Sequence, residues 1–383
     1  MRFPGMAGAA LSVGLTLSCV AGGSDRNNAS VAQENAGEQR PHGFLVSAPD
    51  MSASRAAHTA TAVPDGRVLI AGGFVEKGAA TGAEVYEPDA GRFSPLPPMN
   101  TTRHSHTATL LADGRVLIVG GYGERATTLA NAEVFDPATN SFAPTGSLLA
   151  ARADHIAVLL ENGKVLIAGG LGPGWEFLKG AELYDPGTGR FSPTGSMTVP
   201  RESHAAVRLL DGRVLIAGGH RGRRADITLH ASAELYNPAT GAFTRVGDLC
   251  IRRHKHDAVL LPDGQVLITG GSDDSDDRGV YDTSELYDPK TATFTAGPPM
   301  RLGRYKHAGS SMVLLSGLVL IAGGAPQAEV YDPRSRTFVL VPGDARMAGQ
   351  FSAVAPLKRG GALITGGYGN GGGPRSSAWL YQP

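Results

Sequence analysis

Short apolar runs recur along the whole chain, and polar turns rich in glycine separate them. One of these runs is Val-Leu-Ile in six places and Ala-Leu-Ile in a seventh, at Ala362–Ile364. It shows no alternation of apolar and polar residues, which predicts a strand buried on both faces, as in stacked sheets. No 3.6-residue period is sustained along the chain, which excludes a helical solenoid.

The run belongs to a module that is repeated seven times. The module reads Arg-x-x-His-x-Ala-x-x-Leu-x-Asp-Gly-x-Val-Leu-Ile-x-Gly-Gly, then a loop of variable length, then Ala-Glu-x-Tyr-Asp-Pro and a later Phe and Met. Successive Gly-Gly pairs are 43 to 53 residues apart, which is the length of one four-stranded blade. The pairs stand at 72–73, 120–121, 169–170, 218–219, 270–271, 323–324 and 366–367.

Each module is expected to hold four short strands, a to d. In the third module we expect them at His155–Leu160, Val165–Gly169, Ala181–Tyr184 and Arg190–Ser192. Asp-Gly or Asn-Gly joins strands a and b in modules one to five, as at Asp65-Gly66. This dipeptide is a strong hairpin signal, because a tight primed turn needs positive φ.

An aromatic pair spaced Tyr/Phe-x6-Phe closes six of the modules, as in Tyr86 and Phe93. With the Gly-Gly pair, it makes the module resemble the kelch motif, in which Trp more often holds the last position. The resemblance covers about 340 residues and implies an all-β, seven-bladed kelch-type β-propeller with four antiparallel strands per blade. A WD40 propeller is disfavoured because the Trp-Asp signature is absent.

The seventh module stops after its third strand, at Tyr381-Gln382-Pro383. The segment Phe44–Met51 mirrors Phe93–Met99, which is a fourth strand followed by its Met. We therefore expect the N-terminal strand to complete the last blade, which would remove an exposed sheet edge.

The N-terminus predicts export. Met1–Ser18 has a basic residue followed by an apolar stretch of about 12 residues, too short to span a membrane. Cys19 follows in a context that resembles a bacterial lipobox, so we expect its lipidation. Soluble secretion after conventional cleavage and a cytoplasmic protein are the alternatives. The predicted organisation is a signal segment at 1–19, a disordered tether at 20–42 and the propeller at 43–383, secreted or anchored to the cell envelope.

The charge composition argues against one class of partner, nucleic acid. The 35 basic and 35 acidic residues cancel, and there is no basic stripe, so nucleic acid is not expected. We expect a monomer that meets a membrane only through a lipid anchor. No nucleophile elbow, zincin helix, P-loop or dinucleotide fingerprint is present.

Six modules begin strand a with Arg-x-x-His, and the seventh has Arg346 with Gly349 in the His position. These side chains could hold a metal or an anion near the axis. Alternatively, each His bonds nearby backbone and each Arg pairs with the recurrent Glu of its module. The second interpretation is favoured, because it explains why the residues recur in blade after blade. The sets are Arg55/His58/Glu84, Arg103/His106/Glu133, Arg152/His155/Glu182, Arg201/His204/Glu234, Arg253/His256/Glu285 and Arg304/His307/Glu329.

Residues that break the repeat are better candidates for function. His104 with His106, and His254 with His256, are spaced by two, which would put both members on one side of a strand and makes each pair a candidate metal site.

The loops between strands b and c vary most, and rigid scaffolds often carry specificity in such loops. Trp175 in the third loop could stack on a sugar ring. The fourth loop is basic and the fifth acidic, and we expect the two to pair across the blade boundary. The alternatives are an anion or acidic-glycan site on the basic loop and a calcium site on the acidic one. The residues are His220, Arg221, Arg223 and Arg224, and Asp273, Asp274, Asp276 and Asp277.

The stretch His256–Gly264 is also similar to propeller modules of the galactose-oxidase-like copper enzymes. That resemblance implies two His, an axial Tyr and a Tyr cross-linked to Cys. No Tyr directly precedes a strand-a His here, so the resemblance supports the fold and argues against the chemistry. The preceding residues are Ala57, Ser105, Asp154, Ser203, Lys255 and Lys306.

The sequence thus favours a non-enzymatic binding module without a cofactor, which presents its b–c loop face to a protein or a carbohydrate. The alternative is an enzyme, either a metal-dependent oxidase or a carbohydrate-active enzyme, with its site at the axial mouth on the His/Arg side. Copper or calcium is the alternative to the absence of a cofactor.

Overall fold

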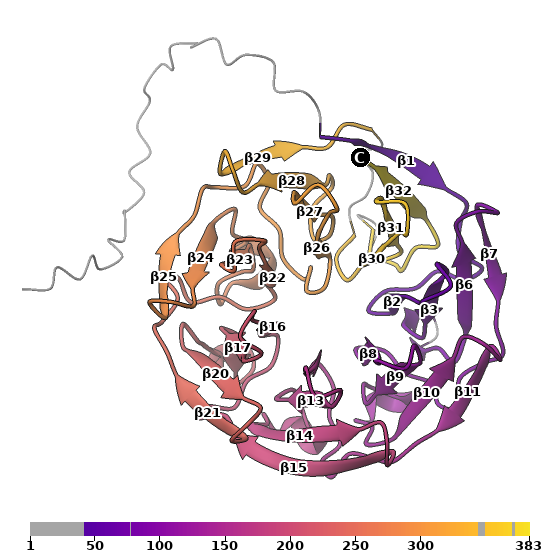
Figure 1. Ribbon diagram of the computed structural model, residues 1–383, viewed down its shortest axis with the longest axis horizontal. Helices are drawn as coiled ribbons and strands as arrows, with labels where there is room; N and C mark the ends of the chain where they lie inside the picture. The colour runs from indigo at the N-terminus through magenta and orange to yellow at the C-terminus, as the bar shows by residue number, and fades with distance from the viewer. Residues whose placement is uncertain (1–41, 77, 344–348, 370–371) are drawn as a thin grey trace, which may run out of the picture. The chain divides into compact units, whose positions relative to one another are not determined.

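The computed structural model describes residues 42–76, 78–343, 349–369 and 372–383. These residues form seven four-stranded antiparallel sheets around a central axis, a seven-bladed β-propeller (Figure 1). In the first blade the strands run outward from the axis as β2 (Thr59–Ala62), β3 (Val68–Ala71), β6 (Ala83–Glu87) and β7 (Arg92–Pro95).

The next five blades repeat this order. They are β8 (Thr107–Leu110), β9 (Val116–Val119), β10 (Ala132–Asp136) and β11 (Ser141–Pro144); β12 (Ile156–Leu159), β13 (Val165–Ala168), β14 (Gly180–Asp185) and β15 (Arg190–Ser196); β16 (Ala205–Arg208), β17 (Val214–Ala217), β20 (Ala233–Asn237) and β21 (Ala242–Arg245); β22 (Asp257–Leu260), β23 (Val266–Thr269), β24 (Ser284–Asp288) and β25 (Thr293–Ala296); β26 (Ser311–Val313), β27 (Val319–Ile321), β28 (Glu329–Asp332) and β29 (Thr337–Leu340).

The b–c loops carry the remaining regular structure. Two small hairpins lie in the first and fourth loops, and single 3₁₀ turns lie in loops two to five. Their bounds are β4 (Phe74–Val75) with β5 (Gly78–Ala79), β18 (His220–Arg221) with β19 (Thr228–Leu229), η1 (Glu124–Ala126), η2 (Pro173–Trp175), η3 (Arg224–Asp226) and η4 (Asp276–Arg278).

All four strands predicted for the third blade are confirmed, with small differences at their ends. Strand a begins at Ile156 rather than His155, and strands c and d extend to Asp185 and Ser196. The Val-Leu-Ile strands are buried throughout, as their lack of alternation predicts.

The core is divided among the gaps between neighbouring blades. In one cluster, Leu69 and Val85 of the first blade lie with Val116, Ile118 and Phe135 of the second. Because each sheet is covered by a sheet on either side, the b strands have no solvent-facing side.

The N-terminal strand closes the ring as predicted. β1 (Phe44–Ala48) pairs antiparallel with β32 (Ala378–Gln382), the last strand of a blade that also contains β30 (Ala353–Pro356) and β31 (Ala362–Thr365). The five-residue register runs from Phe44 opposite Gln382 to Ala48 opposite Ala378.

The predicted alignment of the seventh module is wrong by three residues. Gly324 N–H donates to the Gly349 carbonyl, just as Gly73 N–H donates to the Arg103 carbonyl, so Gly349 occupies the Arg position. Ser352, three residues later, therefore occupies the His position. Trp379 lies opposite Ile364, where Glu84 lies opposite Ile70, so the recurrent Glu is also replaced in this blade.

Candidate functional site

Buried Arg–Glu pairs tie each of the first six blades together. Arg103 Nη2 lies 2.8 Å from Glu133 Oε1, and Arg103 Nη1 donates to the Gly120 carbonyl at the end of strand b. Glu133 Oε2 accepts the Asn100 N–H from the segment that enters the blade. Each pair thus joins strands b and c to the entering chain. The nitrogen–oxygen distances range from 2.7 to 3.1 Å in Arg55–Glu84, Arg103–Glu133, Arg152–Glu182, Arg201–Glu234, Arg253–Glu285 and Arg304–Glu329.

The favoured structural interpretation of these arginines is confirmed. All six arginines are almost wholly buried, and the guanidinium of each already forms an ion pair with a carboxylate of its own blade. Burial lowers the pKa of Arg103, while Glu133 acts in the opposite direction. An anion from solution would therefore have to displace an internal ion pair.

The strand-a imidazoles also belong to the scaffold, although their partners differ from the predicted backbone groups. His106 packs on Gly72 of the preceding blade, where an added Cβ would lie 2.8 Å from its Cε1. Its Nε2 lies 3.1 Å from the Thr59 hydroxyl of that blade. Threonine hydroxyls hold four of the six rings in this way, in His58–Thr365, His106–Thr59, His155–Thr107 and His307–Thr269.

Burial lowers the pKa of His58 to about 3, and the charge of Arg55 lowers it further. Burial also lowers the pKa of His204 well below its ordinary value. These rings are neutral at physiological pH. His204 has no hydrogen-bond partner on either nitrogen within the described part of the chain.

The residue directly before each strand-a His, or before Ser352 in the last blade, lies at the axis in the left-handed conformation, with φ between 50° and 59°. Six of these residues donate their N–H to the carbonyl of the equivalent residue in the preceding blade, at 2.8 to 3.2 Å. We call this set the inner ring. It consists of Ala57, Ser105, Asp154, Ser203, Lys255, Lys306 and Phe351.

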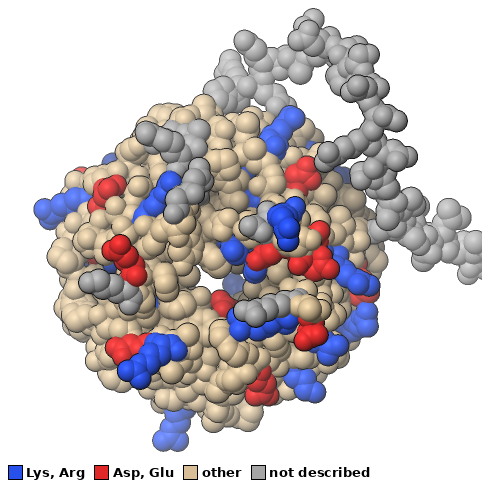
Figure 2. Space-filling view, turned by 180° about the vertical axis from the view of Figure 1, so that it is seen from behind, with Lys and Arg blue, Asp and Glu red and all other residues tan. Residues whose placement is uncertain are grey.

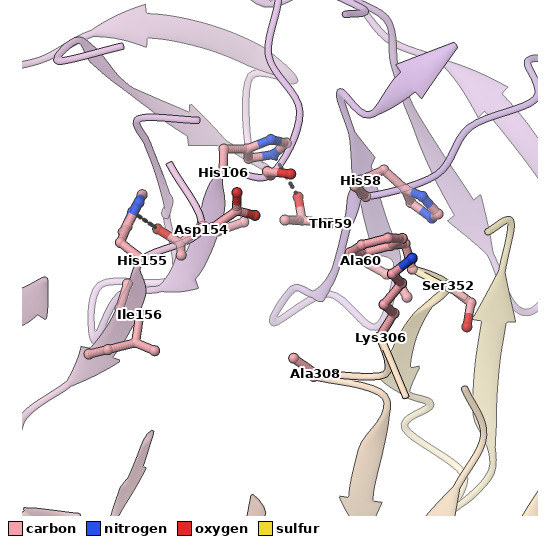
Figure 3. A pocket seen from close by; sticks show the side chains of 18 of the residues that line it. His58, Thr59, Ala60, His106, Asp154, His155, Ile156, Lys306, Ala308 and Ser352 are labelled. Atoms are coloured by element: carbon pink, nitrogen blue, oxygen red, sulfur yellow. Dashed lines mark hydrogen bonds between the residues drawn. The ribbon is translucent and has the colours of Figure 1, made fainter. Parts of the chain in front are cut away.

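The inner ring surrounds a cavity of about 360 Å³ that continues along the strand-a residues beneath it. Figure 3 shows Asp154 and Lys306 reaching this cavity from different blades, with His58, His106 and His155 around it. One face of the propeller is hollowed at its centre, and its Lys, Arg, Asp and Glu side chains gather mainly to one side of the opening (Figure 2).

Asp154 is the one acid among the seven inner-ring residues, and its pKa is strongly shifted. Its withdrawal from solvent and the charge of Glu202 raise its pKa to about 7, although hydrogen bonds from Ser105 and Tyr122 act in the opposite direction. A carboxyl group with this pKa can both donate and accept a proton near neutrality.

The two positively charged side chains of the ring come from blades five and six. Lys255 Nζ lies 2.6 Å from Asp276 Oδ1, on the fifth b–c loop. Lys306 Nζ lies 4.8 Å from the ring centre of Tyr305 and 5.6 Å from that of Phe351.

Aromatic side chains from four neighbouring blades form a second arc outside the inner ring, which we call the aromatic rim. His104 lies between Phe74 and Tyr122, at centroid distances of 5.5 and 5.3 Å, and Trp175 continues the series 6.1 Å from Tyr122. The rim consists of Phe74, His104, Tyr122, Trp175 and Tyr368.

The predicted His pairs do not act as pairs. Ser105 and Lys255, which stand between their members, have positive φ, so the alternation of an extended strand is interrupted. His104 joins the aromatic rim while His106 turns to Thr59. His254 Nδ1 instead lies 3.0 Å from His220 Nδ1, whereas His256 packs on Gly218.

The acidic and basic loops also find other partners than each other. The Arg223 guanidinium lies 3.5 Å over the Trp175 ring, and Asp276 binds Lys255 of its own blade. His220 Nε2 binds Glu202 at 2.9 Å. No ion pair joins the two loops among the side chains that the structure describes. Arg223 of loop four instead packs on Trp175 of the third blade.

The remaining candidates are more dispersed. Arg221 and Asp274 are exposed, and Asp273 accepts the Ser275 N–H. The side chains of Arg224 and Asp277 and all of Cys19 lie outside what the structure describes. Within the described ranges, no group of three or more His, Cys, Asp or Glu is arranged to hold a metal ion.

The residues do not fit the copper centre implied by the galactose-oxidase resemblance. Lys255 and Lys306 precede His256 and His307 where an axial Tyr would be needed. Cys250 donates its N–H to Glu285 and packs on the core between blades four and five, away from the inner ring.

The inner ring was not identified as a site from the sequence. The sequence indicates the inner ring in one way. The residue before the strand-a His differs in charge and size from module to module, whereas the Arg and His near it are repeated.

Comparison with known proteins supports the repeat and the fold. A family model described as the Kelch motif matches residues 55–100 and 103–148. A fungal alcohol oxidase of the AA5 family, solved in complex with copper, superposes with a TM-score of 0.67 at 16% identity over 89% of this chain and 76% of that one. The structure of YjhT superposes with a TM-score of 0.58 at 13% identity, over 87% and 96%. At these identities the likeness concerns the fold alone.

No curated protein matches the chain. A search of the described residues for a helix long and apolar enough to cross a membrane finds none. The chain is thus a seven-bladed β-propeller whose first two blades carry Kelch motifs.

Proposed function

We propose that this propeller is a carbohydrate-binding protein and that it holds its ligand at the axial mouth, over the inner ring. The observation that carries the proposal is the contrast between neighbouring positions of the repeat. The Arg and Glu positions recur and bind each other, and the His positions recur and are buried, whereas the inner ring brings Ser, Asp, Lys and Phe to one cavity.

The cavity suits a sugar in size and in chemistry. About 360 Å³ is within the usual range for small-ligand sites. Ser105, Asp154 and Ser203 offer hydroxyl and carboxyl groups to a polyol. Phe351 lines the cavity and offers a flat apolar face on which a sugar ring can stack. The aromatic rim does not line the cavity, and its rings would serve only a ligand that extends beyond it. Trp175 is 46% exposed, so part of its ring remains available beside Arg223.

A glycan array followed by titration calorimetry tests this function. The wild-type protein should bind a defined group of glycans, and Asp154→Ala should weaken that binding at least about tenfold, because a charged hydrogen-bonding group is lost. Asp211→Ala is the matched control, since Asp211 pairs with Arg213 in the a–b turn of its blade. Absence of glycan binding, or equal affinity of the Asp154 variant and the wild type, would refute the proposal.

We also propose that binding takes place outside the cytoplasm. The support is the sequence of Met1–Ser18 and the lipobox-like setting of Cys19. Mass spectrometry of the mature protein from a membrane fraction should find a diacylated N-terminal Cys19, and Cys19→Ala should release the protein from that fraction. An unprocessed N-terminus in the soluble cytoplasmic fraction would contradict the proposal.

A carbohydrate-active enzyme is the second candidate, and Asp154 favours it. A carboxyl with a pKa of about 7 beside a second carboxyl, Glu202, is suited to proton transfer. Mass spectrometry of the bound glycan after incubation tests this role. Products that form with the wild type and not with Asp154→Asn would establish it, and an unchanged glycan would leave the protein a binder.

A further inference from the structure

Two lysines occupy adjacent places in the inner ring. Lys306 donates its N–H to the Lys255 carbonyl at 2.9 Å, and both side chains line the axial cavity. The other five members are Ala, Ser, Asp, Ser and Phe. The cationic side chains of the ring are therefore confined to the arc formed by blades five and six, and Asp154 stands in the third blade. Figure 3 shows Lys306 and Asp154 on different sides of the cavity.

A carboxylate of the protein itself occupies this arc. Asp276 reaches it from η4, and its Oδ1 lies 2.6 Å from Lys255 Nζ. Lys306 also acts electrostatically on Asp276. Burial acts to raise the pKa of this carboxyl, but Lys255, Lys306 and His254 together outweigh it and the pKa is lowered. Asp276 remains 43% exposed on its loop, with a positive φ of 56°.

We propose that Lys255 and Lys306 form a carboxylate subsite, that Asp276 is its internal stand-in, and that the ligand is an acidic sugar whose carboxylate displaces Asp276. The inference rests on the proposed carbohydrate function and names the class of sugar. Asp276 is a suitable competitor because it is held by a short loop at the surface, unlike the Glu partners of the buried arginines.

The polarity of the mouth would also orient such a ligand. Two ammonium groups attract a carboxylate, since an ammonium group is positively charged and donates hydrogen bonds without accepting any. The Asp154 carboxyl would repel the same group from the opposite arc, where sugar hydroxyls can instead bind Ser203 or Asp154. Phe351, next to Lys306, would lie against the sugar ring.

The test compares acidic oligosaccharides with their carboxyl-reduced counterparts by titration calorimetry. The probes are uronic-acid oligosaccharides and the same molecules after reduction of each carboxylate to an alcohol. The acidic forms should bind at least about tenfold more tightly, and Lys255→Gln with Lys306→Gln should abolish this preference. Asp276→Asn should strengthen binding of the acidic form several-fold, because the internal competitor loses its charge.

Lys164→Gln is the matched control, since Lys164 pairs with Asp185 away from the axial cavity and should leave the preference unchanged. Equal affinity for the acidic and reduced forms would overturn the carboxylate subsite while the carbohydrate function stands. Failure of every probe to bind would overturn both. Weaker binding of the acidic form to Asp276→Asn would show that Asp276 helps to hold the ligand, and would also contradict the proposal.

Discussion

Arg103 and Glu133 show how a charged pair can be part of the scaffold at the scale of single residues. Each of them is buried, and together they bind groups from three separate segments. In the last blade the two positions change together, to Gly349 and Trp379. This joint replacement is expected, because one buried charge without its partner is costly, whereas an apolar pair is tolerated.

Glu133→Ala should therefore lower the free energy of unfolding by about 3–5 kcal/mol, since it leaves the Arg103 guanidinium buried without a counter-charge. Urea denaturation measures the loss. Asp113→Ala, which breaks the exposed pair with Arg115, is the control and should cost less than about 1 kcal/mol. Similar losses in both variants would contradict the structural role of the buried pair.

Asp154 is a different case, because its environment opposes its charge. Its pKa is about 7 in the folded protein and near its ordinary 3.8 in the unfolded chain. Between these values the folded state binds more protons than the unfolded state, so this carboxyl lowers stability as the pH rises from about 4 to 7.

Asp154→Asn should remove that penalty. At pH 8 the variant should be more stable than the wild type by about 1–3 kcal/mol, and at pH 4 the two should differ little. Thermal unfolding at several pH values measures this difference. A gain that does not grow with pH would mean that Asp154 has an ordinary pKa. A stabilising substitution that also weakens binding would be typical of a residue kept for function.

At the scale of elements, the blades could be predicted from the sequence because their signals are local. The Asp-Gly turn fixes the a–b hairpin, and the lack of alternation in Val-Leu-Ile indicates burial on both faces. The inner ring could not be predicted in the same way. It depends on one left-handed residue per blade and on hydrogen bonds between blades, which no single module encodes.

Two other predictions were wrong for the same reason, which is that a single module does not encode contacts between blades. In the seventh module Arg346 was aligned with the recurrent Arg, yet the hydrogen bond from Gly324 places Gly349 there. The charged loops four and five were expected to pair, but Arg223 contacts Trp175 in the opposite direction around the ring. Spacing along the chain carries no information on which neighbour a loop side chain contacts.

The imidazole contacts between blades give a prediction at this scale. Thr269 and Thr365, at the ends of b strands, bind the imidazoles of the following blades, but the equivalent residue in the third blade is Ala168. The other hydroxyl position, which Thr59 and Thr107 hold at the start of strand a, is Ile156 in this blade. With neither hydroxyl present, His204 lacks a partner within the described residues.

Ala168→Thr should give His204 a hydroxyl and raise the free energy of unfolding by about 0.5–1.5 kcal/mol. Ala168→Val is the matched control, because it has the same shape without a hydroxyl and Val119 already fills this position in the second blade. Urea denaturation of the two variants and the wild type measures their free energies of unfolding. If Val stabilises as much as Thr, packing and not the hydrogen bond is responsible.

The whole molecule is held as a ring by β1. Leu45 of this strand is buried in the last inter-blade core, and its N–H donates to the Pro342 carbonyl of the sixth blade. Met51 fills the gap between the last blade and the first, beside Val68 and Ile70. The N-terminal segment Phe44–Met51 therefore contributes to both junctions of the closing blade.

A variant that begins at Ser52 should lose at least about 3 kcal/mol of unfolding free energy, because Leu45 and Met51 leave the core and the edge of β32 is exposed. Thermal unfolding and sedimentation measure stability and association together. An unchanged melting temperature in a monomeric variant would show that the ring does not need this closure.

The central claim is that the recurrent charges form the scaffold and that the ligand contacts the inner ring. A crystal structure of the propeller with the glycan that binds most tightly tests it most directly. The account predicts the sugar at the axial mouth, in contact with Asp154, Phe351 and Lys306, with all six buried Arg–Glu pairs intact. A sugar bound at the a–b turns or on the outer d strands, with the inner ring empty, would contradict it.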